Sequence, residues 1–261
     1  MASLDFQNIT YEKRDMIAIL TINREDRLNA INAQTSSEML AAWEDFRDDD
    51  SLRVAILTGV GEKSFSTGMD LVATAKGENQ FAGRPAPFGG FTKRLPIYKP
   101  IIAAINGFCL AGGMELALTC DIRICTPEAR FGLPEVRWAI MPGAGGTQRM
   151  PRAIPQAWAN YLILTADQMD AETARQIGLV SHVVPKEELM DRALQIAATI
   201  CERGPLAVRA AKEAILRGQD MPLEHGLAYE DLVLGRLMAT DDAKEGPRAF
   251  AEKRKPEYRG R

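Results

Sequence analysis

Two glutamates lie twenty positions apart, each just after a turn that contains glycine or proline. Glu115 ends the sequence GGME at 112–115, and Glu135 ends FGLPE at 131–135. Two carboxyl groups can act as a proton donor and a proton acceptor when their surroundings separate their pKa values. A third turn, FSTGMD at 65–70, precedes both glutamates. These segments predict proton transfer beside backbone groups that can stabilise an oxyanion.

The glycine turns supply candidates for the oxyanion donors. Such a site needs two preorganised N–H groups aimed at the oxygen on which negative charge develops. Gly112 places a backbone N–H at the start of an expected helix, and Met69, which follows Gly68, can present the second. A glutamate in a first helical turn is more often only a favourable charge near the helix dipole. The joint occurrence of turns and carboxyl groups favours catalysis by Glu115 and Glu135.

Composition and charge exclude several other functions. The chain has 261 residues, 46% of them hydrophobic, and a formal net charge of −3. This is an ordinary globular composition without a general attraction to nucleic acid or anionic membranes. The most apolar stretch, 101–120, contains Asn106 and Glu115 and is expected to be core rather than a membrane span. We therefore expect neither nucleic acid nor a membrane as a partner.

Metal binding and export are not expected either. The chain has two histidines, and its four cysteines form no CxxC pair, so they are expected to be buried free thiols. The first residues, MASLDFQNITYEK, show no export or import pattern, which predicts a cytoplasmic protein.

Three familiar motifs fail on inspection. The sequence GVGEKS at 59–64 carries Glu62 where a phosphate-binding loop needs glycine. The run GAGG at 143–146 lacks the third glycine spacing of a dinucleotide fingerprint. No GxSxG segment supports a serine nucleophile.

The secondary structure that must position the glutamates is predicted to change along the chain, from alternating strands and helices to helices alone. Strand patterns occupy 9–13, 16–22, 54–58, 101–105, 121–125 and 130–133, and helical patterns occupy 35–48 and the segment that starts at Gly112. From 154 onward the patterns are helical, at 154–164, 171–177, 186–203, 205–217, 223–238 and 241–253. Residues 73–99, rich in glycine and proline, predict a loop or lid. An α/β core followed by helices is expected.

Three ordered motifs together resemble the crotonase (enoyl-CoA hydratase/isomerase) family. They are FSTGMDL at 65–71, NGF at 106–108 running into GGME at 112–115, and FGLPE at 131–135 followed by MPGAGGTQR at 141–149. The resemblance runs from about Ile9 to the tail at 249–254. It implies a spiral core of ββα units with an acyl-CoA site in residues 1–200, and a C-terminal helical trimerisation region in 201–261. It also implies a homotrimer or a dimer of trimers.

The resemblance further implies an acyl-CoA thioester as substrate. Coenzyme A would be part of that substrate, and no separate cofactor is expected. The backbone N–H groups of Met69 and Gly112 would bind the thioester oxygen. Members with both glutamates are typically hydratases, whereas those that keep only the second are typically isomerases. Here Glu115 would be the base that activates water, Glu135 the acid that protonates the α-carbon, and the Gly143 N–H a group that positions the water.

Ten further residues are candidates for contact with coenzyme A or the acyl group. They are Arg24, Arg27, Ala30, Thr67, Gly68, Asp70, Leu71, Trp138, Phe250 and Lys253. Among them the two arginines and the two tail residues are candidates for the end of coenzyme A that carries the phosphates. Trp138 is expected either to reshape the acyl pocket or to pack in the core, and the loop at 74–99 is expected to contribute to that pocket. Val72 stands where many hydratases have a lysine.

Four alternatives stay open. Within enzymes these are an enoyl-CoA isomerase and a specialised dehydratase or hydratase, for example one that acts on a carnitinyl or branched acyl-CoA. One branch of the family binds RNA through a lysine-rich first helix, but here that helix is acidic, with EDFRDDD at 44–50. A catalytically inactive subunit would not need both glutamates. The acyl chain, the physiological direction and the pathway are not predicted.

Overall fold

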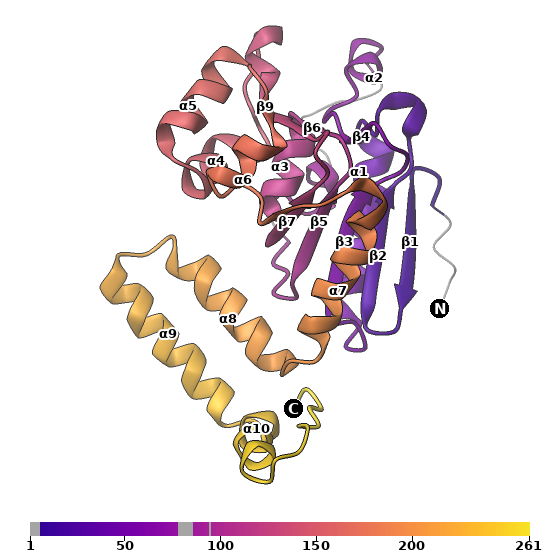
Figure 1. The fold of residues 1–261 in the computed structure, drawn as a ribbon. Helices are drawn as coiled ribbons and strands as arrows, with labels where there is room; N and C mark the ends of the chain where they lie inside the picture. The colour runs from indigo at the N-terminus through magenta and orange to yellow at the C-terminus, as the bar shows by residue number, and fades with distance from the viewer. Residues whose placement is uncertain (1–5, 78–85, 94) are drawn as a thin grey trace.

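The computed structural model describes residues 6–77, 86–93 and 95–261, and Figure 1 shows their arrangement. Part of the predicted loop at 73–99 therefore lies outside the described residues. The described part of that segment consists of the end of helix α2 (Leu71–Ala75), the short 3-10 helix η2 (Phe88–Gly90) and irregular chain leading to residue 100.

A six-stranded sheet forms the centre of the fold. Its order is β1-β2-β3-β5-β7-β10, and its strands are β1 (Ile9–Arg14), β2 (Ile17–Ile22), β3 (Val54–Gly59), β5 (Ile101–Ile105), β7 (Ile122–Cys125) and β10 (His182–Val183). The first pair is antiparallel, and the other neighbours are parallel. The predicted strands at 9–13, 16–22, 54–58, 101–105 and 121–125 are confirmed.

Helices cover both faces of this sheet. Helix α1 (Ala33–Asp48) places Trp43 and Phe46 in the core cluster that includes Ala55 and Leu57 of β3. Helix α7 (Leu189–Cys201) packs against Val54 and Ile56, which point to the opposite face. Alternate residues of β3 therefore serve two cores, which explains its continuous apolar sequence.

A second sheet positions the candidate site. Its order is β4-β6-β8-β9, and its strands are β4 (Ser64–Ser66), β6 (Phe108–Leu110), β8 (Arg130–Gly132) and β9 (Met169–Asp170). The first three are parallel, and each leads directly into a segment singled out by the sequence. β4 precedes the turn at Met69, β6 precedes helix α3 (Gly112–Thr119), and β8 precedes the 3-10 helix η3 (Pro134–Trp138). The three turns therefore meet at the carboxyl ends of parallel strands, where α/β folds place ligands.

Helices dominate the rest of the chain. They are α4 (Gly146–Ala153), α5 (Gln156–Thr165), α6 (Ala171–Gln176), α8 (Pro205–Gly218), α9 (Leu223–Met238) and α10 (Asp241–Ala251), with short 3-10 turns η1 (Glu25–Arg27) and η4 (Lys186–Glu188). Figure 1 shows α8, α9 and α10 extending away from the sheets. A 2.7 Å ion pair between Lys212 of α8 and Asp121 attaches this part to the core. The proposed division at 200/201 falls at the end of α7, and its oligomerisation role stays a prediction.

Several large apolar side chains on the α8–α9 pair are exposed to solvent. They are Ile215, Leu216, Leu223, Leu227, Leu232, Leu234 and Met238. All four cysteines are buried and free, as predicted. Within the described residues, no helix combines the length and hydropathy needed to cross a bilayer. The same part of the chain contains no cluster of three or more potential metal ligands.

Candidate active site

A cavity of about 1130 Å³ opens where the three turns meet. All five residues predicted to act as acid, base, oxyanion donors or water-positioning group line it, namely Met69, Gly112, Glu115, Glu135 and Gly143. The described parts of the predicted loop contribute as well, through Thr74, Ala86, Pro87, Phe88, Thr92, Lys93 and Leu95. The expected contribution of that loop to a pocket is confirmed for its described residues.

The turns at Met69 and Gly112 lie against each other. A parallel bridge joins Ile31 to Met69, in which Ile31 N–H donates to the Gly68 carbonyl and Asp70 N–H donates to the Ile31 carbonyl. Because neighbouring peptide groups of an extended chain point in opposite directions, this bridge leaves the Met69 N–H facing away from Ile31. Gly112 is the first residue of α3, and the first N–H groups of a helix have no intrahelical acceptor. Two backbone donors therefore border the cavity.

Gly68 and Gly112 are required by close packing. Gly68 has φ +87°, and a Cβ atom built on it would lie 2.5 Å from the Gly112 nitrogen. A side chain at Gly112 would collide with the ring of Phe88. Because neither Gly68 nor Gly112 has a side chain, the Gly112 N–H stays accessible between the turn that follows β4 and Phe88.

Glu115 is a buried carboxyl group with a defined orientation. Its side chain lies in the first turn of α3 and is 3% exposed. The Oε1 atom accepts hydrogen bonds from the backbone N–H groups of Ala144 and Gly146, each at 2.7 Å. Burial has the largest effect and raises the pKa of Glu115 above its ordinary value, although these two N–H groups, Arg149 and Lys93 each act to lower it. Burial is thus opposed by donors that favour the charged carboxylate.

Glu135 has a different environment. It lies in η3 and is 7% exposed, and its Oε2 atom has no hydrogen-bond partner among the described residues. Burial, together with the charge of Glu115, raises the pKa of Glu135 to about 7. A carboxyl group with this pKa keeps a substantial protonated fraction at neutral pH, whereas Glu115 has groups that stabilise its anion. The pair therefore has the asymmetry needed for one acid and one base.

The other candidate contacts fall into three groups, the first of which lines the cavity. Thr67, Leu71 and Trp138 line the cavity. Trp138 is 64% exposed, so it does not pack in the core, and that alternative is wrong. Val72 is exposed and is not among the cavity-lining residues.

Arg24, Asp70 and Ala30 brace the turn rather than line the cavity. The Arg24 guanidinium pairs with Asp70 at 3.0 Å and also donates to the Ala30 carbonyl. Asp70 in turn accepts a hydrogen bond from the Ala73 N–H and so caps α2. These contacts hold the backbone on both sides of Met69.

Arg27, Phe250 and Lys253 are not among the residues that line the cavity. Arg27 pairs with its neighbour Asp26 at 3.3 Å. Phe250 is 86% exposed on α10, which Figure 1 places at the opposite end of the molecule from α2, and Lys253 follows that helix. Contacts of these three residues with coenzyme A stay predictions.

Sequence reasoning misses the loop that binds Glu115. In the sequence the GAGG run at 143–146 appears as a failed dinucleotide motif and as part of a family motif with a water-positioning Gly143, yet it supplies both N–H donors to the carboxylate. The available signal is a glycine-rich turn before a helix, which is a general anion-binding arrangement. Arg149 and Lys93, which hold this loop, are missed as well.

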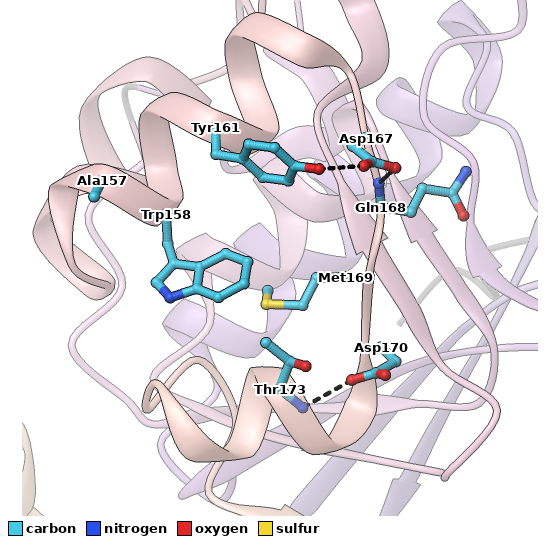
Figure 2. Close-up of a pocket in the computed structure, with 8 residues that line it drawn as sticks. All are labelled: Ala157, Trp158, Tyr161, Asp167, Gln168, Met169, Asp170 and Thr173. Atoms are coloured by element: carbon cyan, nitrogen blue, oxygen red, sulfur yellow. Dashed lines mark hydrogen bonds between the residues drawn. The ribbon is translucent and has the colours of Figure 1, made fainter.

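A second, smaller cavity of about 460 Å³ lies beside α5. Figure 2 shows Trp158, Tyr161 and Met169 around it, with the Tyr161 hydroxyl directed at Asp167. The Tyr161 hydroxyl donates to Asp167 at 2.5 Å, and the Thr173 N–H donates to Asp170 at 2.8 Å. None of the predicted site residues lines this cavity.

Comparison with known proteins identifies the family of this chain. The sequence profile of the enoyl-CoA hydratase/isomerase family matches residues 12–261. The chain belongs to this family. It is 43% identical to (E)-benzylidenesuccinyl-CoA hydratase of Thauera aromatica, covering 97% of this chain and 99% of that protein. It is 42% identical to carnitinyl-CoA dehydratase of Citrobacter koseri, covering 98% and 99%.

The fold agrees with a solved family structure. The crystal structure of enoyl-CoA hydratase from Mycobacterium tuberculosis H37Rv superposes with a TM-score of 0.91, at 41% identity over 97% of this chain and 99% of that one. The predicted crotonase-type α/β fold is thereby confirmed. Hydratases and dehydratases are both hydro-lyases, and this chain is a hydro-lyase of the enoyl-CoA hydratase type.

Proposed function

We propose that this protein catalyses the reversible addition of water to a 2-enoyl-CoA thioester, giving a 3-hydroxyacyl-CoA. The observation that carries the proposal is the difference between the two glutamates in one cavity. Glu115 is held by two N–H donors that favour its anion, whereas Glu135 is buried with an unpartnered oxygen and a pKa of about 7. A hydration needs one carboxylate and one carboxylic acid at the same time.

The thioester oxygen binds the N–H groups of Met69 and Gly112. When water adds to the β-carbon, negative charge moves onto this oxygen, and each preorganised donor lowers the barrier by about 3 kcal/mol. The N-terminus of α3 adds a favourable dipole at the same place. Gly68 and Phe88, which confine Gly112, keep this donor in position.

Two proton transfers accompany the addition. Glu115 accepts a proton from water as the water oxygen bonds to the β-carbon, and Glu135 gives its proton to the α-carbon. The carbon–carbon double bond becomes single, and exchange with solvent restores both glutamates. The Gly143 N–H, at the cavity edge, helps hold the water. Dehydration follows the same steps in reverse.

Coenzyme A is part of the substrate in this proposal, and the acid–base steps need no separate cofactor. The exposed apolar side chains of α8 and α9 support assembly with further copies of the chain, as a homotrimer or a dimer of trimers. Phe250 lies on α10 and Lys253 just after it, so their contact with coenzyme A would be made at a neighbouring copy's cavity.

The acyl group is only partly constrained. Relatives of nearly equal identity are named for a benzylidenesuccinyl and a carnitinyl thioester. Phe88 and the exposed Trp138 line the cavity, so these two side chains limit which acyl groups fit, and a substrate of a specialised dehydratase stays an alternative. An isomerase that relies on Glu135 alone would not need the two-donor site built around Glu115.

A panel of 2-enoyl-CoA thioesters with different length, branching and aryl groups tests the proposal. Hydration removes the absorbance of the conjugated thioester, so the wild-type protein should decrease that absorbance with at least one substrate. No turnover of any substrate would contradict the hydratase function, although the family would stand. Conversion to a 3-enoyl-CoA without water addition would favour the isomerase instead.

A further inference from the structure

Two cations hold the loop that binds the Glu115 carboxylate. The Lys93 ammonium donates to the Gly143 carbonyl at 2.7 Å. The Arg149 guanidinium donates to the Ala144 carbonyl at 3.0 Å and, through its other terminal nitrogen, to the Thr92 carbonyl at 2.7 Å. Lys93 and Arg149 therefore both connect the segment 92–93 to the segment 143–144 through hydrogen bonds.

The Lys93 ammonium and the Arg149 backbone N–H each reach the Glu115 carboxylate through a single peptide group. The carbonyl of Gly143 and the N–H of Ala144 belong to the same peptide, so Lys93 and Glu115 bind its two ends. The second peptide that donates to Glu115 has its carbonyl on Gly145, which accepts from the Arg149 backbone N–H at 2.8 Å. Hydrogen bonds in such chains polarise one another, so a cation on the carbonyl strengthens the N–H donor.

The loop is shaped to accept Arg149. Gly145 has φ +115°, and any Cβ atom there would collide with the Arg149 guanidinium. A Cβ atom on Gly146 would lie 3.0 Å from the Glu115 Oε1 atom and 2.9 Å from Leu133. Both glycines therefore allow the guanidinium and the carboxylate to approach the same turn.

The same contacts connect Glu115 with the segment 86–93. This segment is seated on α1, because the Trp43 indole donates to the Gly89 carbonyl at 3.2 Å and the Gly89 N–H donates to the Ser36 hydroxyl at 3.2 Å. Its Phe88 lies against Gly112. One short segment therefore contacts the oxyanion donor through Phe88 and the carboxylate-binding loop through Lys93.

We propose that Lys93 and Arg149 are positioning residues for the base Glu115, acting through the peptides of residues 143–146. This inference rests on the proposed function, because it assigns Glu115 the role of base. Lys93 orients the Ala144 N–H, and Arg149 fixes the turn that carries Ala144 and Gly146. Together they aim the carboxylate at the cavity and stabilise its anion.

The charges around Glu115 support this role. Among the described residues, the charged groups facing it are Lys93 from the loop, Arg149 from α4 and Glu135 from η3. Strands β4 and β6, which also pack against α3, carry no charged side chain. The two cations lower the pKa of Glu115 against the effect of burial.

The test is the pH profile of kcat/KM for Lys93→Met, with Lys93→Arg and Arg152→Met as controls. The acidic limb of this profile is the fall in kcat/KM at low pH, where the base Glu115 becomes protonated. Lys93→Met removes a charge that favours the Glu115 anion, so it should move this limb to higher pH by roughly 0.5–1 pH unit. This shift is smaller than a directly contacting charge would give, because a peptide lies between Lys93 and Glu115. Lys93→Met should lower kcat more than it changes KM. Lys93→Arg should restore the limb, and Arg152→Met should leave it unchanged, since Arg152 lies on the same helix but bonds to Gln148. Arg149→Met should shift the limb in the same direction.

An unshifted acidic limb in Lys93→Met would overturn the proposal. A raised KM with an unchanged limb would do so as well, because it would make Lys93 a direct substrate contact. A second readout needs no turnover. The ¹³C carboxyl resonance of Glu115, assigned by its loss in Glu115→Gln, should titrate at higher pH in Lys93→Met than in wild type. This readout separates the inference from the proposed function, since it stands even if no enoyl-CoA is hydrated, and equal titration curves would refute it.

Discussion

Replacing Gly68 with alanine should damage the oxyanion site without touching either glutamate. The new methyl group would lie 2.5 Å from the Gly112 nitrogen, inside any permitted contact, so it must displace this donor or exclude the thioester oxygen. Loss of one oxyanion donor typically lowers kcat by roughly 10²–10³, equivalent to about 3–4 kcal/mol of barrier. We expect a decrease of this size in steady-state hydration of the best substrate.

Backbone strain is a separate effect that a matched variant can measure. Gly68 has φ +87°, where a non-glycine residue costs roughly 1–2 kcal/mol. Gly178 has φ +81°, and a Cβ atom on it would meet nothing within 4 Å, so Gly178→Ala carries the strain without the steric conflict. Both variants should lose a few degrees of Tm, but only Gly68→Ala should lose kcat. Equal kcat values in the two variants would refute the reasoning.

Two further predictions concern the acid and the acyl pocket. Burial raises the pKa of Glu135 to about 7, so kcat/KM should fall as pH rises through that value, and Glu135→Gln should raise Tm at pH 8 but not at pH 4. Between the ordinary glutamate pKa and about 7, the folded protein keeps a proton on Glu135 that the unfolded chain has released, so the free energy of unfolding falls as pH rises through this range. The same Tm difference between variant and wild type at pH 4 and at pH 8 would contradict this prediction. Trp138→Ala should increase kcat/KM for branched or aryl enoyl-CoA substrates relative to short linear ones, with stability changed by less than about 0.5 kcal/mol because the side chain is largely exposed. An unaltered substrate preference in the panel would show that Trp138 does not limit the acyl group.

Long apolar segments and ordered motifs allow most of the fold to be predicted. β3 and β5 are buried on both faces, and their continuous apolar sequences identify them. β4 and β6 have three residues each, too few to show a periodic pattern, so they are missed although they position Met69 and Gly112. Helix α4 is missed too, because it follows a glycine run and contains Pro151.

The parts of the site that local sequence determines can be predicted. The parts that depend on tertiary contacts are missed. The turns at Met69 and Gly112 and both glutamates belong to compact motifs. The hydrogen bonds from Ala144 and Gly146 join residues about thirty positions from Glu115, and the Arg24–Asp70 pair spans 46 positions. No local pattern encodes such pairings, because they arise only when separate strands meet. The exposure of Trp138 could not be predicted from local sequence either, since it depends on how η3 packs against the rest of the fold.

Steady-state hydration by Glu115→Gln and Glu135→Gln tests the central claim most directly. Gln preserves the size of each side chain but cannot exchange the proton, so each variant should lose roughly 10²–10⁴ in kcat. Glu172→Gln is the matched control, because Glu172 is exposed on α6 and pairs only with groups on that helix in the described structure. It should keep wild-type kcat. Wild-type hydration by Glu115→Gln, with the protein folded and saturated with substrate, would contradict the assignment of an acid–base pair.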